Sequence, residues 1–112
     1  MTLNERDSQY LWHPYTQHKT AALPIAIKKG EGALLWDENN KEYIDAIASW
    51  WVNPYGHSNT FIADAIYKQL TTLEHVLFGG FTHEPAIILA EKLMEILPKN
   101  QQKLFFSDNG ST

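Results

Sequence analysis

The sequence has no cysteine, no long apolar run and no excess of positive charge. The lack of cysteine excludes a disulfide framework and a thiolate metal site, which fits a reducing compartment. The apolar runs are far shorter than the ~20 residues that a membrane-spanning helix needs. Nine basic residues against 13 acidic ones give a net charge of -4, so no basic surface is expected to follow a phosphate backbone. We therefore expect neither nucleic acid nor a membrane as a partner.

The residues that are present have the balance of a globular protein, with 44% apolar and 20% charged residues in a chain of 112. The polar start of the chain resembles neither a signal peptide nor a transit peptide, so we expect a cytoplasmic protein. Four Trp, five Tyr and five Phe are a heavy aromatic content for this length, and several of them lie beside Gly, Pro or Asn. Such rings either fill a core or line a ligand pocket.

The first half of the chain alternates extended segments with turns. Residues 1–12 are expected to form a short helix, and the two prolines of residues 13–24 indicate an extended surface segment. Apolar segments follow at residues 25–27, 33–36 and 41–44, separated by residues 28–32 and by the turn sequence Asp-Glu-Asn-Asn. This pattern predicts a small antiparallel meander.

The second half is predicted to contain two amphipathic helices and one strand. Asn59 or Thr60 caps the first helix. Its buried face would consist of Ile62, Ile66, Leu70 and Leu73. The second helix begins near residues 82–85 and ends before Pro98, and residues 103–106 form a short buried strand. Because the meander is too small to cover both helices, we expect a fragment of a larger α/β enzyme.

A turn of small polar residues follows this strand. Gly110 lets a backbone approach an anion closely, and Ser111 adds a hydroxyl donor next to the N–H groups of a helix start. This pattern is typical of a phosphate site. Turns of this composition also form for conformational reasons alone, so the residues by themselves leave both interpretations open.

Three other segments combine aromatic residues with glycine, proline or histidine, at residues 12–15, 49–57 and 75–83. On an extended chain the adjacent side chains of Trp50 and Trp51 would point to opposite sides. One ring would then pack into the protein and the other would form an apolar wall for an aliphatic substrate; the alternative is that both rings lie in a core. The histidines 57, 75 and 83 lack metal-ligand spacing and carboxylate partners, so no metal site is predicted.

In order and spacing these segments resemble the class III pyridoxal-phosphate-dependent aminotransferases, and in particular the branch that serves biotin synthesis. The residues that carry the resemblance are Trp12-His13-Pro14-Tyr15-Thr16, Ser49-Trp50-Trp51, Gly56-His57, the segment 75–80, Thr82-His83 and Gly110-Ser111. The resemblance covers nearly the whole chain and implies the fold-type I, aspartate-aminotransferase-like α/β fold. Residues 1–46 would form the N-terminal segment and part of the small domain, and residues 47–112 the start of the large cofactor-binding domain.

The resemblance also implies roles for individual residues. Gly110 and Ser111 would bind the phosphate of pyridoxal 5'-phosphate, Trp50 would line the substrate pocket and Tyr15 would close it. Residues 78–82 would lie at the interface of a homodimer. Asn109 stands where serine is common in the family, but asparagine tolerates the same turn conformations.

The implied reaction aminates 8-amino-7-oxononanoate to 7,8-diaminononanoate, with S-adenosylmethionine as the expected amino donor. The lysine that holds the cofactor has a family position beyond Thr112, so we expect no catalytic residue in this chain and no activity of the chain alone. Two alternatives stay open, namely another class III ω-amino acid aminotransferase and a non-enzymatic α/β interaction module. The donor also stays open between adenosylmethionine and lysine.

Overall fold

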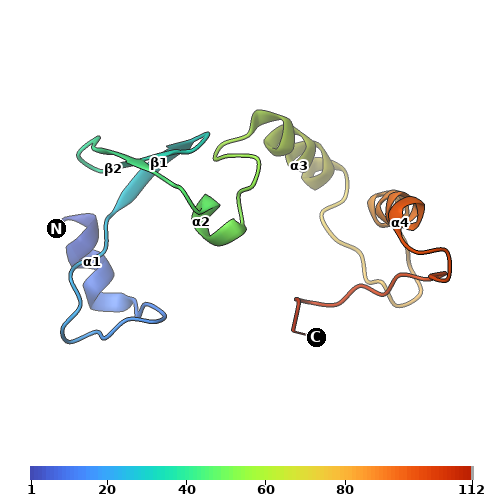
Figure 1. Cartoon of the computed structure of the whole chain (residues 1–112), viewed down its shortest axis with the longest axis horizontal. Coiled ribbons are helices and arrows are strands. Elements are labelled where there is room, and N and C mark those ends of the chain that lie inside the picture. The colour runs from blue at the N-terminus through green and yellow to red at the C-terminus, as the bar shows by residue number, and fades with distance from the viewer. Residues whose placement is uncertain (112) are drawn as a thin grey trace. The chain divides into compact units, whose positions relative to one another are not determined.

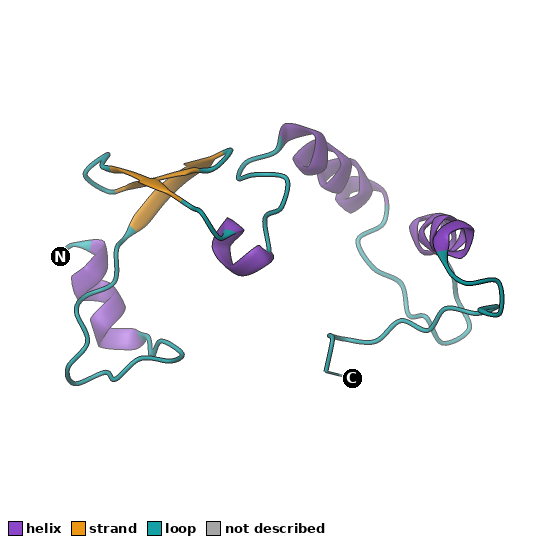
Figure 2. Ribbon diagram, in the orientation of Figure 1, coloured by secondary structure: helices purple, strands orange, loops and turns teal. Residues whose placement is uncertain are grey.

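The computed structural model describes residues 1–111 and contains two compact units, the first comprising Met1–Tyr67 and the second beginning at Lys68. The elements in chain order are α1 (Leu3–Tyr10), β1 (Ile27–Glu31), β2 (Leu34–Asp37), β3 (Glu42–Ile44), α2 (Ala48–Trp51), α3 (Thr60–Thr72) and α4 (Glu84–Ile96), as Figure 1 and Figure 2 show. Within residues 1–111, none of the helices has both the length and the apolar character needed to cross a membrane.

The strands form one antiparallel sheet in the order β1-β2-β3, which confirms the predicted meander. Leu34 on the central strand pairs with Glu31 on one side and with Ile44 on the other. The first strand covers residues 27–31 instead of the predicted 25–27, because the hairpin reverses at Gly32. Glycine adopts the φ of 56° found there without the clash that a Cβ would cause. Lys28 and Lys29 therefore belong to the strand and not to the turn.

The turn between β2 and β3 is organised by the carboxylate of Asp37. Its Oδ1 accepts hydrogen bonds from the backbone N–H groups of Asn39 (2.8 Å) and Lys41 (2.9 Å), and its Oδ2 accepts one from the Tyr43 hydroxyl (3.0 Å). The N–H of Lys41 is the main reason why the pKa of Asp37 lies below its ordinary value. The turn that the sequence predicts thus forms through a side chain that bonds its own backbone.

Two of the helices, α3 and α4, begin at the signals that the sequence predicts, and α1 begins at a capping box that was not predicted. A capping box opens α1, in which the Thr2 hydroxyl accepts the N–H of Glu5 at 3.2 Å and the Glu5 carboxylate accepts the N–H of Thr2 at 2.8 Å. Asn59 caps α3, since its Oδ1 accepts the N–H of Ile62 at 3.1 Å. In α4, Pro85 lies in the first turn. The three helices expected from the sequence are therefore confirmed.

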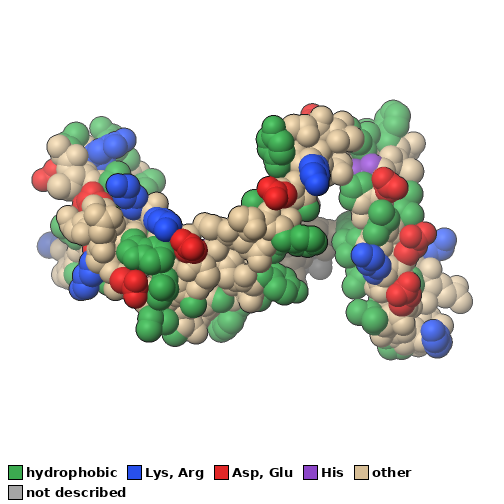
Figure 3. Space-filling model, turned by 90° about the horizontal axis from the view of Figure 1, so that it is seen from above, with side chains coloured by type: hydrophobic (Ala, Val, Ile, Leu, Met, Phe, Trp, Pro, Cys, Tyr) green, Lys and Arg blue, Asp and Glu red, His purple; other side chains and the backbone are tan. Residues whose placement is uncertain are grey.

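The apolar faces of α3 and α4 are open, so the burial predicted for the first of these helices is wrong here. The exposed fraction is 54% for Ile66, 56% for Leu70 and 47% for Leu89. Among residues 1–111, no other helix or strand packs on either helix. Figure 3 shows that apolar side chains, drawn in green, reach the surface in several patches of the face in view.

Residues 103–106 do not form the predicted strand. They have no place in a sheet, and the Phe105 side chain is 91% exposed. A strand is defined by the neighbour with which it exchanges hydrogen bonds, and the sheet of the described residues contains only β1, β2 and β3. The apolar sequence of this segment is therefore not enough to make it a strand in this structure.

Candidate functional site

The backbone that carries the two adjacent tryptophans is a left-handed turn. Ser49 (φ 49°, ψ 49°) and Trp50 (φ 66°, ψ 51°) lie in the left-handed helical region, and Ala48 and Trp51 have φ values of 49° and 65°. Each non-glycine residue in this region costs about 1–2 kcal/mol relative to the right-handed one. The prediction of an extended chain at this point is therefore wrong, and the conformation requires interactions that offset its strain.

Both indoles of this turn lie on the surface of the first unit. Trp50 is 55% exposed and Trp51 is 77% exposed, so neither ring is a core residue among the described residues. Their ring centroids are 6.1 Å apart. The alternative in which both rings fill a core is thus wrong for this structure.

A hydrogen-bonded cluster around the Asp45 carboxylate holds the left-handed turn. Its Oδ1 accepts the backbone N–H of Ser49 at 2.9 Å, and its Oδ2 accepts the Ser49 hydroxyl at 2.7 Å. The same Oδ2 lies 2.7 Å from Nε2 of His57, which donates because a carboxylate only accepts. The hydrogen bonds of Ser49, its N–H first, and then that of His57 lower the pKa of Asp45 to about 2. Asp45 is therefore held as a carboxylate.

His57 is fixed from the side of the sheet as well. Its backbone N–H donates to the carbonyl of Gly32 at 2.8 Å, and its own carbonyl accepts the N–H of Gly32 at 3.1 Å. A Cβ added to Gly30 would lie 2.8 Å from the Cβ of His57, so only glycine leaves room for the imidazole there. The Ser58 hydroxyl donates to the Gly30 carbonyl at 2.6 Å. These contacts place the ring against β1 and next to Asp45.

The two residues predicted to bind substrate, Tyr15 and Trp50, lie in contact. Their ring centroids are 5.6 Å apart in an edge-to-face arrangement, one of the preferred geometries of aromatic pairs. Tyr15 is 91% exposed and adopts a φ of 54° in the loop before β1. The structure thus brings together an indole face and a phenol that are distant in sequence, and both remain accessible to a ligand.

The predicted phosphate turn lies in the second unit and is fully accessible. No atom lies within 4 Å of the position that a Cβ of Gly110 would occupy. Ser111 is exposed, and its N–H donates to Oδ1 of Asn109 at 2.8 Å. These residues fit a phosphate, because the exposed Asn109 side chain can release the Ser111 N–H, which can then donate to an anion. The turn then presents the N–H and hydroxyl of Ser111 beside open backbone at Gly110.

The segment expected at a dimer interface lies ahead of α4. Gly80 has a φ of 96°, which favours glycine at this position. The ring of Phe78 makes edge contacts with His83 and Phe106, at centroid distances of 5.7 and 5.8 Å. Within residues 1–111, the buried Nδ1 of His83 has no hydrogen-bond partner. These residues form a small aromatic cluster at the start of α4.

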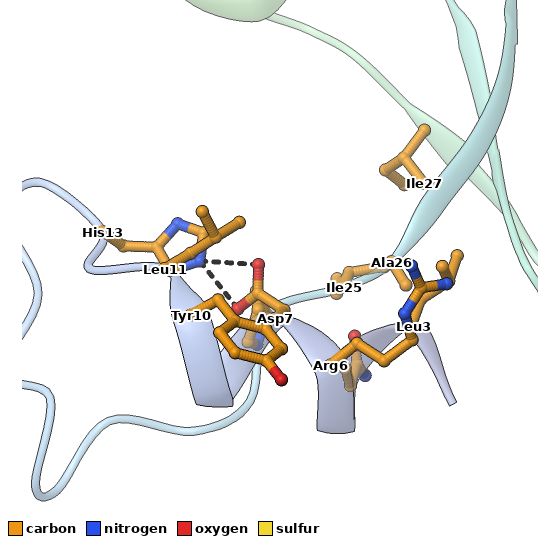
Figure 4. A pocket seen from close by; sticks show the side chains of 11 residues that line it. Leu3, Arg6, Asp7, Tyr10, Leu11, His13, Ile25, Ala26 and Ile27 are labelled. Atoms are coloured by element: carbon orange, nitrogen blue, oxygen red, sulfur yellow. Dashed lines mark hydrogen bonds and ion pairs between the residues drawn. The ribbon is translucent and has the colours of Figure 1, made fainter. Parts of the chain in front are cut away.

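A separate hollow of about 480 Å³ lies between α1 and the chain that enters β1. Figure 4 shows its wall, where Nε2 of His13 approaches the Asp7 carboxylate at 2.8 and 3.0 Å. Neither Tyr15 nor Trp50 is among the residues that line it. It is therefore distinct from the substrate surface that the sequence predicts.

No sequence pattern singled out Asp45. The available signal is weak, since it consists of a serine four residues later, at the spacing where an aspartate can bond a following backbone N–H. His57 was visible as part of the Gly56-His57 pair, but its carboxylate partner lies 12 residues earlier. Such a pair is recognisable only when the hairpin brings both ends of the segment together.

Comparison with known proteins identifies related sequences and folds. The family model for class III aminotransferases matches residues 15–112. An adenosylmethionine-8-amino-7-oxononanoate aminotransferase from Synechococcus elongatus is 50% identical over 103 residues, which are 92% of this chain and 24% of that protein. The chain thus spans about a quarter of the length of such relatives.

Solved structures give the same result for the fold. The crystal structure of the adenosylmethionine-8-amino-7-oxononanoate aminotransferase from Methanocaldococcus jannaschii matches with a TM-score of 0.88 and 40% identity, over 97% of this chain and 25% of that one. An ω-transaminase from Pseudomonas jessenii in complex with PMP matches with a TM-score of 0.80 and 40% identity, over 88% of this chain and 22% of that one. The predicted fold class is confirmed.

The depressed pKa of Asp45 predicts a pH dependence of stability. Its folded pKa of about 2 lies below the ordinary value of 3.8, so the carboxylate stabilises the fold fully above pH ~4. The contribution is lost as the pH falls toward 2, and about half of it is gone near pH 3. We expect the difference in unfolding free energy between the parent and Asp45→Asn, measured by urea titration, to shrink from pH ~5 to pH ~3. A difference that does not change with pH would contradict this assignment.

Proposed function

The chain belongs to the class III aminotransferases, a family of pyridoxal-phosphate-dependent enzymes, and we propose that it is part of an adenosylmethionine-8-amino-7-oxononanoate aminotransferase. The observation that carries this proposal is the identity to relatives of that name, of which the one from Synechococcus elongatus is the example above. Because the chain spans only a quarter of such a relative, the activity is proposed for the whole protein. The reaction would pass an amino group from S-adenosylmethionine to the ketone of 8-amino-7-oxononanoate.

The Tyr15 and Trp50 pair is proposed as part of the substrate site. An exposed indole offers an apolar face for the aliphatic chain of 8-amino-7-oxononanoate, and its burial on binding contributes roughly 25 cal/mol per Å². A phenol in edge contact with this indole adds an apolar ring and a hydroxyl, which suit both the acceptor and the adenine of the donor. Two accessible aromatic groups at 5.6 Å support this role.

Gly110 and Ser111 are proposed to hold the phosphate of pyridoxal 5'-phosphate. When bound, this cofactor acts as the electron sink of the reaction. Gly110 leaves space for the anion, and Ser111 donates from its hydroxyl and, once Asn109 yields, from its N–H. The solved ω-transaminase with PMP supports a cofactor of this chemical class.

We assign no lysine of this chain to the cofactor. Lys28, Lys68, Lys92 and Lys103 are all exposed. A lysine that serves as the nucleophile of such a site is usually desolvated or adjacent to another cation, which lowers its pKa. We therefore propose that the cofactor-bearing lysine belongs to the rest of the protein.

The division and assembly of the whole protein follow from the same proposal. Residues 1–46 would belong to the N-terminal segment and small domain, and residues 47–112 to the large domain. We propose a cytoplasmic homodimer that acts on small molecules, with residues 78–82 at the subunit interface. The aromatic cluster beside Gly80 supports an interface role, because such clusters supply contact area in oligomers.

A second candidate is an ω-amine aminotransferase of the same family, which the match to the Pseudomonas jessenii ω-transaminase favours. The full-length protein distinguishes the two when it is supplied with 8-amino-7-oxononanoate and, in turn, adenosylmethionine, lysine or a simple ω-amine as donor. We expect formation of 7,8-diaminononanoate with adenosylmethionine. Turnover of a simple ω-amine with an ordinary keto acid, and none with 8-amino-7-oxononanoate, would favour the second candidate.

Replacement of Trp50 by alanine in the full-length enzyme is expected to weaken substrate binding and to leave the cofactor in place. Loss of roughly 100 Å² of apolar contact corresponds to ~2.5 kcal/mol, so the KM for 8-amino-7-oxononanoate should rise about ten- to a hundredfold. Steady-state kinetics and the visible absorbance of the cofactor check the two parts. Trp36→Ala, a tryptophan of β2 outside the site, serves as the control and should leave this KM unchanged.

Replacement of Ser111 by alanine should lower cofactor affinity about ten- to a hundredfold, because a hydrogen bond to a charged group contributes roughly 1.5–3 kcal/mol. Gly110→Val should lower it further, since the side chain would fill the open space beside the backbone. Titration of the full-length apoprotein with pyridoxal phosphate measures both. Ser8→Ala, an exposed serine of α1 whose hydroxyl donates within its own helix, is the control and should leave the affinity unchanged. Parent-like affinity of both site variants would place the phosphate elsewhere.

A further inference from the structure

Asp45 and His57 lie at the two ends of the segment that carries Trp50 and Trp51. Both ends are attached to the same hairpin of the sheet. The backbone N–H of Asp45 donates to the Ala33 carbonyl at 2.8 Å, and that of His57 donates to the Gly32 carbonyl at 2.8 Å. The side-chain contact of 2.7 Å between Asp45 and His57 then joins the two ends above the hairpin. The loop is therefore closed at its base by backbone and side-chain bonds together.

The position of Trp50 depends on this closure because its ring has little packing of its own. Trp50 is 55% exposed, and within residues 1–111 the aromatic rings in contact with it are those of Tyr15 and Trp51. Its direction is therefore set mainly by its backbone. The residue immediately before it, Ser49, is bonded to Asp45 through both its N–H and its hydroxyl. Asp45 thus fixes the backbone at the point from which the indole projects.

The cluster is not arranged for nucleophilic catalysis, although it contains a serine, a histidine and an aspartate. In a catalytic triad the aspartate and the serine bind opposite nitrogens of the imidazole. Here Asp45 and Ser49 both face Nε2 of His57, at 2.7 and 3.5 Å. The Ser49 hydroxyl already donates to the carboxylate. Nδ1 of His57 faces the Asn53 amide at 3.5 Å. The arrangement holds a backbone conformation and does not activate a nucleophile.

We infer that Asp45 and His57 are positioning residues for the substrate site, which hold the left-handed turn so that Trp50 meets Tyr15 and faces the acceptor. This inference rests on the proposed role of Trp50 and adds two residues that touch neither substrate nor cofactor. The side chains of Asp45 and His57 are only 6% and 16% exposed, so they act through the turn and not by contact with a ligand. Substrate affinity should therefore depend on Asp45 and His57, although neither residue contacts the substrate.

The test compares variants of the full-length holoenzyme. Asp45→Ala and His57→Ala remove the closure, and His57→Gln keeps an amide donor near the position of Nε2. Gly30→Ala approaches His57 from the opposite side, where the new Cβ would lie 2.8 Å from the His57 Cβ. Because it leaves Asp45 and His57 in place, it also serves if either alanine variant does not fold.

Asp37→Ala is the matched control for these variants. Like Asp45, Asp37 is a carboxylate of the first unit that accepts three hydrogen bonds, two of them from the turn that follows it. Its turn carries no proposed substrate residue. It therefore measures what the loss of a turn-organising carboxylate does to activity through stability alone.

Three quantities are measured for each variant, namely the KM and kcat for 8-amino-7-oxononanoate, the visible absorbance of bound cofactor, and the near-ultraviolet circular dichroism of the indoles. We expect the KM to rise about tenfold or more in Asp45→Ala, His57→Ala and Gly30→Ala. Cofactor absorbance and kcat should stay near those of the parent, and the indole signal should change. His57→Gln should lie close to the parent, and Asp37→Ala should leave the KM and the indole signal unaltered.

Other outcomes overturn the inference in distinguishable ways. If Trp50→Ala raises the KM and the Asp45, His57 and Gly30 variants do not, the positioning role is wrong and the proposed substrate role of Trp50 stands. If Asp37→Ala raises the KM equally, the effect is a general loss of stability and the positioning role is again wrong. If Trp50→Ala itself leaves the KM unchanged, the substrate role of Trp50 is wrong, and the inference that depends on it is wrong as well.

Discussion

The left-handed turn at residues 48–51 depends on one carboxylate. Four successive non-glycine residues with positive φ are a conformation that the chain leaves unless something opposes the strain. The Asp45 side chain accepts from the backbone and hydroxyl of Ser49 and from His57, and its depressed pKa reflects how strongly these donors favour the charged form. The position that we attribute to Trp50 depends on this interaction, because more than half of the residue is exposed and its backbone sets the direction of the indole.

Features that depend on local interactions could be predicted from the sequence. The cap at Asn59, the proline at the start of α4 and the turn after Asp37 each involve residues within four positions of one another. The meander also follows from local turns. Its first strand lies later in the sequence than predicted, because the chain reverses at Gly32. Family membership could be predicted for another reason, because the motifs of the family are several short sequence segments in a fixed order. The match to the class III aminotransferases confirms this prediction.

Features that depend on distant partners could not be predicted. The extended chain expected at Trp50 gave way to a left-handed turn, because Asp45 and His57 meet only after the hairpin has formed. The strand expected at residues 103–106 does not form, because a strand needs a neighbouring strand and no described segment supplies one. Burial of Ile66 and Leu70 likewise requires a surface to pack on, and periodicity shows only which face would be covered.

The proposed substrate site and the proposed phosphate site rely on different kinds of structure. In the proposed substrate surface, a strained backbone and a closed loop hold two aromatic rings with their centroids 5.6 Å apart. The phosphate turn is simple by comparison, because it needs an unobstructed glycine and a serine with exposed donors. No residue is shared by the two arrangements. On the proposed assignment, a change in the residues that hold the turn of Trp50 would alter binding of the acceptor and leave the phosphate turn intact.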